Sequence, residues 1–343
     1  MASSGAVQQA RLPAWCGIHP VGFDRAGQAA RAFIAWSARR SATVLAACCV
    51  LGAFGSVRAQ PVEVAEGVYA LPGTGGEISR ANRGRVANVA FFVGPSGVVV
   101  VDTGVSYREG EQIIAAVRGV SDRRIALAIL SHPGQEAVFG AAAFQARGIP
   151  VLAHRAAAEL IASRCDGCLR NLTELLGQEA MAGSRVVAPD RVIDASQALD
   201  AIGRPLRIIA PAWSSAPGAL AVFDPTTSTL VAGTLVSIHR VPDLRDADPA
   251  GWRDALREIA ATRCRHLVPA YGPIGSCDDI AALLRYLDAL EARVAELLKA
   301  GVGLAELRGR CDLPEFAAWD QYETLHLQNA NRTYLRLERL QFK

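Results

Sequence analysis

Two buried-strand patterns, each followed by polar residues, constrain the fold of this chain most strongly. Val98–Val101 is a continuous β-branched run, as expected for a strand covered on both faces, and it ends at Asp102-Thr103-Gly104. Ile125–Leu130 repeats the pattern and ends at Ser131-His132, and a helix is predicted over Arg108–Arg118 between the two strands. Because parallel strands end at one rim of a sheet, we expect Asp102 and His132 to lie at a site on that rim.

The residues after the second strand carry a recognisable motif. They read Ser131-His132-Pro133-Gly134-Gln135-Glu136-Ala137-Val138-Phe139-Gly140. The stretch resembles the metallo-β-lactamase-fold hydrolases, whose pattern is Thr-His-x-His-x-Asp-His-x-x-Gly. His132 and Gly140 match it, but Gly134 and Ala137 stand in place of histidines and Glu136 in place of an aspartate. The resemblance implies a four-layer αβ/βα sandwich of the α/β (α+β) class, with the site at one edge of two facing sheets.

The remaining family positions can be aligned and are also changed. Ser215, in Ser215-Ala216-Pro217-Gly218-Ala219-Leu220, takes the place of the third histidine, and Thr234 of Gly233-Thr234-Leu235 replaces the bridging aspartate. Tyr271, in Pro269-Ala270-Tyr271-Gly272-Pro273, replaces the last histidine. Of the seven ligand positions that the resemblance implies, the chain keeps His132 alone.

The family binds one or two zinc ions, and a catalytic zinc needs about three protein ligands and an open position. His132 and Glu136 are two candidate ligands, whereas serine, threonine and tyrosine hydroxyls bind zinc weakly. We therefore expect no metal and no other cofactor, with zinc as the alternative. The old metal cleft would be lined by Asp102, His132, Glu136, Ser215, Thr234, Tyr271 and Arg240. Its carboxylates would need Arg240, His132 or backbone donors as partners.

Further segments narrow the resemblance. Residues 62–340 are similar to the quinoprotein relay system zinc metallohydrolases, which are exported and associated with periplasmic quinoprotein dehydrogenases. The segments that carry this likeness are Gly140-Ala141-Ala142-Ala143-Phe144, Arg240-Val241-Pro242, Gly251-Trp252, Leu327-Gln328-Asn329-Ala330-Asn331 and Leu337-Glu338. Such a likeness implies fold more directly than activity.

Residues 1–59 are predicted to be a leader, and residues 60–343 a single metallo-β-lactamase-fold domain. Arg39-Arg40 precede the short apolar stretch Ser41–Gly55, and cleavage is predicted after Ala59, which describes a secretory signal peptide. The apolar stretch is too short for a membrane span, so none is expected in the mature chain. A lipid anchor at Cys48 is not expected, because the apolar run before it is very short. The predicted location is periplasmic or secreted.

Charge and cysteine content depend on this cleavage. The whole chain has 36 Lys and Arg against 33 Asp and Glu, whereas residues 60–343 have 30 against 32 and a formal charge of −2. This balance excludes nucleic acid as an expected partner. Five of the eight cysteines remain after cleavage, so at least one thiol stays free or pairs outside the chain. They are Cys165, Cys168, Cys264, Cys277 and Cys311.

The second half of the chain is predicted to form another sheet and closing helices. Its expected strands are Arg191–Asp194, Leu206–Ala210, Ala219–Asp224, Thr229–Ala232 and His266–Pro269. Before them, a helix is expected over residues 136–147, then two helices near Ala156–Ser163 and Leu169–Leu176, with Cys165 and Cys168 at their junction. Later helices are expected over residues 249–261, Ile280–Lys299 and Asp320–Leu340. A Gly- and Arg-bearing loop is expected at Gly73–Arg85.

The sequence offers three other chemistries. A Ser–His–Asp hydrolase could use Ser131 or Ser215 with His132 and Asp102, but adjacent residues on a strand point to opposite faces and no Gly-x-Ser-x-Gly elbow is present. Cys165-x-x-Cys168 lacks the setting of a thiol–disulfide redox pair and favours a structural disulfide or plain thiols. A new metal site could use His132, His154 or His239, although isolated histidines are more often structural.

Two functional hypotheses follow from the sequence. The favoured one is a catalytically degenerate, non-catalytic accessory or binding protein that uses the old cleft or its rim, with a small molecule or a periplasmic protein as partner and a link to a quinoprotein system. The alternative is a hydrolase of the ester, thioester or lactone type, with an atypical zinc site or with no metal. The kept residues Asp102, His132 and Glu136 motivate the alternative.

Overall fold

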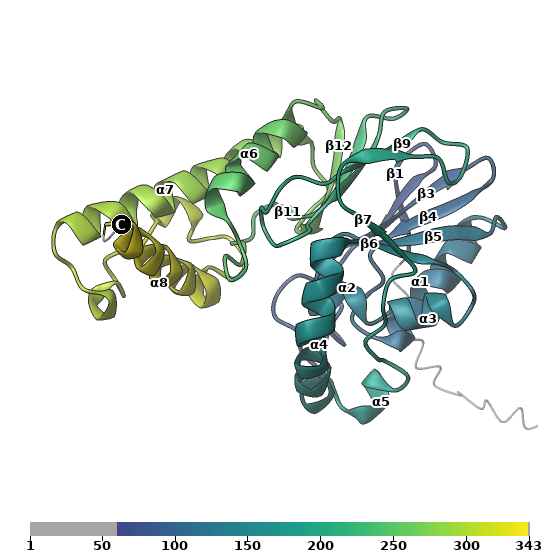
Figure 1. The fold of residues 1–343 in the computed structure, drawn as a ribbon, viewed down its shortest axis with the longest axis horizontal. Helices are drawn as coiled ribbons and strands as arrows, with labels where there is room; N and C mark the ends of the chain where they lie inside the picture. The colour runs from purple at the N-terminus through teal and green to yellow at the C-terminus, as the bar shows by residue number, and fades with distance from the viewer. Residues whose placement is uncertain (1–59, 342–343) are drawn as a thin grey trace, which may run out of the picture. The chain divides into compact units, whose positions relative to one another are not determined.

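The computed structural model describes residues 60–341 and contains two β-sheets with helices outside them (Figure 1). The first sheet consists, in order across the sheet, of β1 (Val62–Ala65), β2 (Val68–Leu71), β3 (Val89–Gly94), β4 (Gly97–Val101), β5 (Ile125–Leu130), β6 (Val151–His154) and β7 (Arg191–Ile193). The second consists of β12 (His266–Tyr271), β11 (Thr229–Ser237), β10 (Ala221–Asp224), β9 (Leu206–Ile209) and β8 (Gln197–Leu199). The mixed α/β class and the sandwich of two sheets and helices are confirmed.

The helices lie on the outer faces of the two sheets. On the first sheet they are α1 (Tyr107–Val120), α2 (Gln135–Val138), α3 (Ala141–Gln145), α4 (Arg155–Leu176) and α5 (Gln178–Met181). On the second they are α6 (Pro249–Ala260) and α7 (Ile280–Lys299), whereas α8 (Tyr322–Gln341) packs on α7 (Figure 1). Three short 3-10 helices lie at Cys277–Asp279, Leu304–Glu306 and Pro314–Phe316. None of the helices in the described part of the chain is long and apolar enough to cross a membrane.

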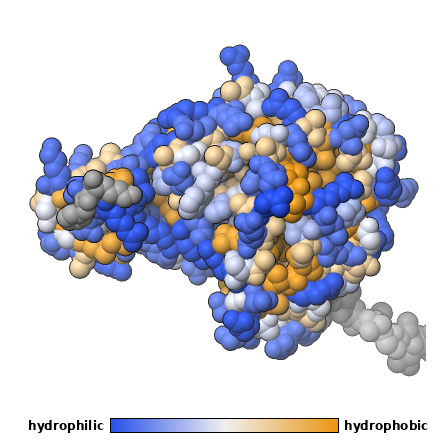
Figure 2. Space-filling model, viewed as in Figure 1, coloured by the Kyte–Doolittle hydropathy of each residue, from blue (hydrophilic) through white to orange (hydrophobic). Residues whose placement is uncertain are grey.

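Three apolar clusters hold these layers together. The cluster between the sheets includes Phe92, Val99 and Leu127 from the first sheet and Val222 and Val231 from the second. The other two clusters fill the spaces between each sheet and its own helices. Because β4 is covered on both faces, all five of its residues are buried, which explains the uninterrupted β-branched run. The face drawn in Figure 2 is largely hydrophilic, with hydrophobic residues gathered in separate patches.

Strands β4 and β5 run parallel and bring their carboxyl ends together. The backbone N–H of Asp102 donates to the Ile129 carbonyl (2.8 Å), and the backbone N–H and hydroxyl of Thr103 both donate to the Ala137 carbonyl (3.0 and 2.6 Å). A Cβ on Gly140 would overlap the Thr103 carbonyl oxygen, so this close approach requires glycine. The retained glycine of the motif is therefore explained by packing of the scaffold.

Several predicted elements are corrected by the structure. The helix expected over residues 136–147 is two short helices, α2 and α3, on either side of Gly140. The two helices expected around Cys165 and Cys168 are the single helix α4, and β7 belongs to the first sheet, parallel to β6, instead of the second. Strands β1 and β8 were not predicted.

Helix α4 continues through Cys-Asp-Gly-Cys for a physical reason. Its buried residues Ala157, Ile161, Cys165, Leu172 and Leu176 recur at spacings of four and seven, so they share one face against the sheet. This burial outweighs the roughly 1 kcal/mol that an internal glycine costs a helix.

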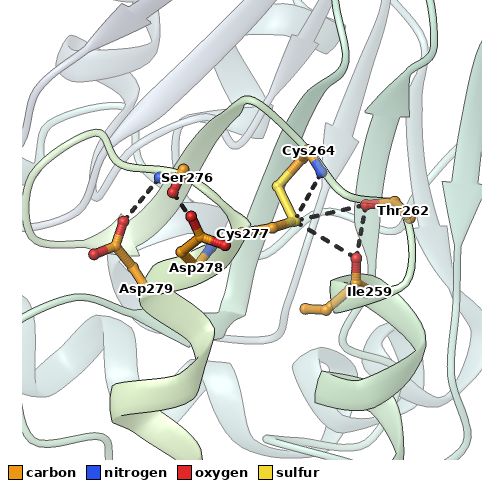
Figure 3. The surroundings of a disulfide bond; sticks show 7 residues. All are labelled: Ile259, Thr262, Cys264, Ser276, Cys277, Asp278 and Asp279. Atoms are coloured by element: carbon orange, nitrogen blue, oxygen red, sulfur yellow. Dashed lines mark hydrogen bonds between the residues drawn. A yellow bond between two sulfur atoms is a disulfide. The ribbon is translucent and has the colours of Figure 1, made fainter.

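A disulfide joins Cys264 to Cys277 beside the amino-terminal end of α7 (Figure 3). Ser276 caps the short helix there, since the Asp278 N–H donates to its hydroxyl (3.2 Å) and its own N–H donates to Asp279 (2.8 Å). The free thiols among the described residues are Cys165, Cys168 and Cys311. The leader predicted over residues 1–59, with Cys48 and the cleavage position Ala59, lies outside the described residues.

Candidate functional site

A cavity of about 180 Å³ lies at the edge where the two sheets meet, and it gathers most of the predicted positions. His132, Gly134 and Glu136 line it from the loop after β5 and the start of α2. Ser215 lines it from the loop before β10, Thr234 from β11 and Tyr271 from the end of β12. Six of the seven family ligand positions thus face one cavity, although they are spread over about 140 residues of sequence. Ala137, the seventh, is a residue of α2 and is buried in the core between the helices and the first sheet.

The centre of the site is a chain of hydrogen bonds that begins at Asp102. The backbone N–H of Ser131 donates to Asp102 Oδ1 (2.8 Å), and the Ser131 hydroxyl donates to Asp102 Oδ2 (2.7 Å). His132 Nδ1 lies 2.8 Å from Ser131 Oγ and His132 Nε2 lies 2.9 Å from Glu136 Oε1. Because the Ser131 proton points to Asp102, we assign Nδ1–H as the donor to Ser131. The Tyr271 hydroxyl then donates to Glu136 Oε1 (2.5 Å).

The charges of this chain follow from its burial and its hydrogen bonds. Burial opposes ionisation of Glu136, but the hydrogen bond and positive charge of His132 outweigh it and lower the pKa of the Glu136 carboxyl to about 2. Burial disfavours the imidazolium, yet Glu136 and Asp102 raise the pKa of His132. Burial raises the pKa of Asp102, and burial together with Glu136 raises the pKa of Tyr271. These shifts favour an imidazolium–carboxylate pair in the cavity beside a neutral phenol.

Asp102 and Arg240, which were also predicted to line the cleft, lie behind the cavity wall. Asp102 is buried beneath Ser131 and does not line the cavity. Arg240 does not line it either: its guanidinium stacks on the Tyr271 ring, with its central carbon 4.3 Å from the ring centroid. It also donates to Asp320 (2.6 Å) and to the Gly76 carbonyl (2.9 Å). Ser215 and Thr234 form a separate pair of hydroxyls 3.1 Å apart.

The expectation that Ser131 and His132 point to opposite faces is wrong, because β5 ends at Leu130 and the two side chains contact each other beyond the strand. Ser131, His132 and Asp102 are thus within hydrogen-bond reach. However, serine lies between aspartate and histidine, whereas a catalytic triad places histidine in the middle. Ser131 is fully buried, and both nitrogens of His132 are engaged. The arrangement holds the loop in place and does not activate a nucleophile.

Residues that the sequence did not single out complete the cavity. Arg164 and Cys168 come from α4, and Asp243, Arg245 and Asp246 come from the segment after Arg240-Val-Pro. Arg164 pairs with Asp246 (2.6 Å) and Arg245 with Asp243 (2.5 Å). The sequence signal that could have predicted these lining residues is the charged run Asp243-Leu-Arg-Asp, which directly follows the segment Arg240-Val-Pro.

The cysteine pair of α4 contributes one thiol to the cavity wall, that of Cys168. Cys165 is buried, and burial raises the pKa of its thiol to about 12. A thiol held in its protonated form is a poor nucleophile, so the structure offers no activated thiolate at Cys165.

The donor set does not fit a zinc ion. No group of three or more His, Cys, Asp or Glu side chains in residues 60–341 is arranged to hold a metal. A Cβ on Gly134 would lie 2.6 Å from His132 Nε2 and would overlap the Glu136 carboxylate. The His132–Glu136 pair therefore fills the space that a side chain at position 134 would need. His239 and His154 lie elsewhere: His154 caps α4 by accepting from the Ala156 N–H (3.1 Å).

The fold and the motif positions together define the class of protein. The chain belongs to the metallo-beta-lactamase superfamily, whose family model matches residues 82–270. It is similar to the linear primary-alkylsulfatase of a Pseudomonas species, with 22% identity over 225 residues, which are 56% of this chain and 42% of that protein. This chain therefore spans about two-fifths of the length of that relative.

Solved structures show the same fold. A metallo-beta-lactamase from Pontibacter korlensis is 18% identical with a TM-score of 0.55, and the match covers 67% of this chain and 98% of that one. The mono-zinc form of the metallo-beta-lactamase FIM-1 from Pseudomonas aeruginosa is 16% identical with a TM-score of 0.53, and the match covers 67% of this chain and 94% of that one. At these identities the likeness establishes the fold alone.

Proposed function

We propose that this protein is a pseudoenzyme of the metallo-beta-lactamase superfamily, a non-catalytic accessory or binding protein that works without a metal. The observation that carries the proposal is the His132–Glu136–Tyr271 chain, which occupies the position of the first family ligands and which a side chain at position 134 would have to displace. The cavity beside it is lined by neutral hydroxyls and by charged side chains that pair with one another. Such a lining suits a polar small molecule more than it suits activation of water.

Metal content and turnover test this proposal. The purified protein is incubated with zinc, dialysed extensively and analysed for metal beside a His132→Ala variant, and both are assayed on esters, thioesters and lactones with and without added zinc. We expect far less than one zinc per chain, no difference between the two proteins and no turnover. About one zinc per chain that is lost in the variant, or turnover that depends on His132, would overturn the proposal and support the hydrolase.

The link to a quinoprotein dehydrogenase system is proposed on the resemblance of the chain segments. Two of these segments contact each other: Asn329 of α8 donates to the Pro242 carbonyl (2.7 Å), and it also accepts from the nearby Leu244 N–H (3.1 Å). These contacts hold α8 against the segment that lines the cavity. They therefore support a shared scaffold more than a shared chemistry.

Complementation tests the quinoprotein link. Deletion of the gene is expected to lower periplasmic quinoprotein dehydrogenase activity. Wild type and Tyr271→Phe should restore it equally, because a non-catalytic protein does not need the Tyr271 hydroxyl. Unchanged dehydrogenase activity after deletion would contradict the link, and failure of Tyr271→Phe alone would contradict the non-catalytic role.

Export is proposed as part of the same function. The Cys264–Cys277 disulfide supports it, because structural disulfides persist in oxidising compartments. Cell fractionation followed by amino-terminal sequencing tests it: we expect a periplasmic protein that begins at Gln60. An uncleaved chain that begins at Met1 and stays in the cytoplasm would contradict export.

A further inference from the structure

A second cavity, of about 290 Å³, lies away from the cleft and is lined by four arginines. Arg80, Arg83 and Arg85 come from the loop before β3, and Arg108 comes from the first turn of α1. Glu109 and Glu179 are the two carboxylates on its wall. It shares no lining residue with the cleft, so a ligand bound there would not depend on the chemistry of His132 and Glu136.

The carboxylates do not balance the positive charge of this cavity. Arg85 lies close enough to Glu109 to influence its charge, and Arg108 lies 3.7 Å from Glu179 with both side chains largely in solvent, which makes that pair weak. Arg80 donates to the Leu175 carbonyl (2.9 Å), a neutral acceptor. The backbone N–H of Arg83 donates to the Arg80 carbonyl (3.3 Å), but its guanidinium makes no hydrogen bond or ion pair with any residue between 60 and 341. Two guanidinium groups therefore remain without a carboxylate partner.

The loop that carries these arginines is held in a defined conformation. Asn82 accepts from the N–H groups of Ser79 and Gly84 (2.9 Å each) and donates to the Glu77 carbonyl (2.7 Å). Arg83 has a positive φ of 54°, a left-handed conformation that costs a non-glycine residue free energy. The arginines are thus presented by an ordered and strained turn, which is the arrangement of a preorganised site.

An apolar cavity of about 190 Å³ adjoins the basic one. The two share Arg85, Glu109 and Gln112 as walls. The remaining wall of the second cavity is largely hydrophobic and consists of Leu71, Pro72, Ala87, Val89, Ile113 and Ala116, with Thr74. Basic and apolar spaces with common walls suit a ligand that has both a charged end and a hydrocarbon part.

We propose that the two adjoining cavities form one binding site for an amphipathic organic anion, with its carboxylate or phosphate at the arginines and its apolar part in the neighbouring cavity. Guanidinium groups bind such oxyanions in pairs of parallel hydrogen bonds. The apolar part adds affinity by leaving water. The site lies outside the cleft and does not rest on the proposed function of the cleft.

Calorimetric titration of the purified protein with octanoate, acetate and 1-octanol tests the two halves separately. We expect octanoate to bind at least tenfold more tightly than either of the others. Arg83→Ala should weaken octanoate about fivefold or more, and Ala116→Phe should weaken octanoate without changing acetate. Arg118→Ala is the matched control, since Arg118 is exposed on the same helix and lines neither cavity; it should leave octanoate binding unchanged.

Several outcomes would overturn the site. Equal affinity for acetate and octanoate would exclude the apolar half, and equal affinity for octanol and octanoate would exclude the arginines. A loss in Arg118→Ala as large as in Arg83→Ala would indicate diffuse charge attraction. Binding to anionic phospholipid vesicles without octanoate binding would indicate a membrane surface in place of a small-molecule site. Thermal unfolding of each variant confirms that the fold is intact.

Discussion

The cleft between the sheets and the cavity beside α1 differ in how their charges are balanced. In the cleft, each arginine and the imidazole face a carboxylate of the protein: His132 faces Glu136, Arg164 faces Asp246 and Arg245 faces Asp243. In the cavity beside α1, the Arg80 and Arg83 side chains form no ion pair with a carboxylate of residues 60–341. The charged side chains of the cleft thus neutralise one another, whereas the cavity beside α1 retains positive charge. The cleft that corresponds to the family's metal site and the cavity proposed to bind an anion are thus different places in this chain.

The strongest test of this comparison is His132→Ala. It removes the imidazole and leaves the Glu136 carboxylate, whose side chain is 10% exposed, without its charged partner. Breaking a buried pair in this way costs about 3–5 kcal/mol of unfolding free energy, which urea unfolding followed by tryptophan fluorescence measures. Arg83→Ala at the other cavity is the matched variant and should stay within about 0.5 kcal/mol. If the two variants lost similar stability, the cleft and the cavity would not differ in the way described.

Gly134→His is the next largest expected effect. It restores one family residue, but the new side chain would overlap the Glu136 carboxylate, so we expect a loss of about 2–3 kcal/mol of unfolding free energy and no retained zinc. Gly119→His on α1 is the control, because a Cβ there meets nothing within 4 Å. Stoichiometric zinc in Gly134→His would show that His132 and Glu136 separate readily, contrary to their role as a fixed pair.

Glu109 gives a pH-dependent test of the basic cavity. Burial raises the pKa of its carboxyl from 4.5 to about 7, although the Val105 N–H and Arg85 oppose this. Between those pH values the folded chain keeps a proton that the unfolded chain has released, so stability falls as pH rises and the penalty is complete above pH 7. Glu109→Gln removes the penalty and can keep the bond from Val105 (2.7 Å).

We expect Glu109→Gln to be about 1–2 kcal/mol more stable than wild type at pH 8 and equal to it at pH 4, as measured by urea unfolding at each pH. The full shift would correspond to roughly 3 kcal/mol, and the partial exposure of the side chain reduces this value. Glu179→Gln, whose side chain is 94% exposed, should show no such pH dependence. A constant gain at both pH values would point to packing instead of ionisation.

How much of this could be predicted from the sequence differs between scaffold and site. The strand Ile125–Leu130 and the helix Ile280–Lys299 were predicted with the bounds that the structure has, because strong apolar periodicity and turn residues mark their ends. Six of the aligned motif positions line the cleft, whereas Ala137, Asp102 and Arg240 do not. Helix α4 was divided wrongly because the cysteine pair was taken as a junction, although one buried face continues through it. Strand β7 was assigned to the wrong sheet because short strands carry no information on their partners.

The side-chain pairings could not be predicted, since they depend on geometry beyond the ends of the strands. Ser131 and His132 meet because the chain leaves the strand after Leu130, and strand periodicity no longer applies there. The basic cavity combines a loop, the start of α1 and the junction of α4 and α5. Its arginines follow no sequence period, so only the folded loop reveals that they face one space.

The smallest expected effect is that of Arg164→Ala at the rim of the cleft, which tests whether an exposed ion pair stabilises the fold as a buried one does. Arg164 and Asp246 are 2.6 Å apart, but their side chains are 45% and 27% exposed. An exposed pair contributes about 0–1 kcal/mol and weakens with salt, so Arg164→Ala should lose less than about 1 kcal/mol, and less still at 1 M sodium chloride. Urea unfolding at low and high salt measures both values, with His132→Ala as the reference that salt should barely change. A salt-independent loss of several kcal/mol in Arg164→Ala would mean that the rim, and not the His132–Glu136 pair, holds the cleft together.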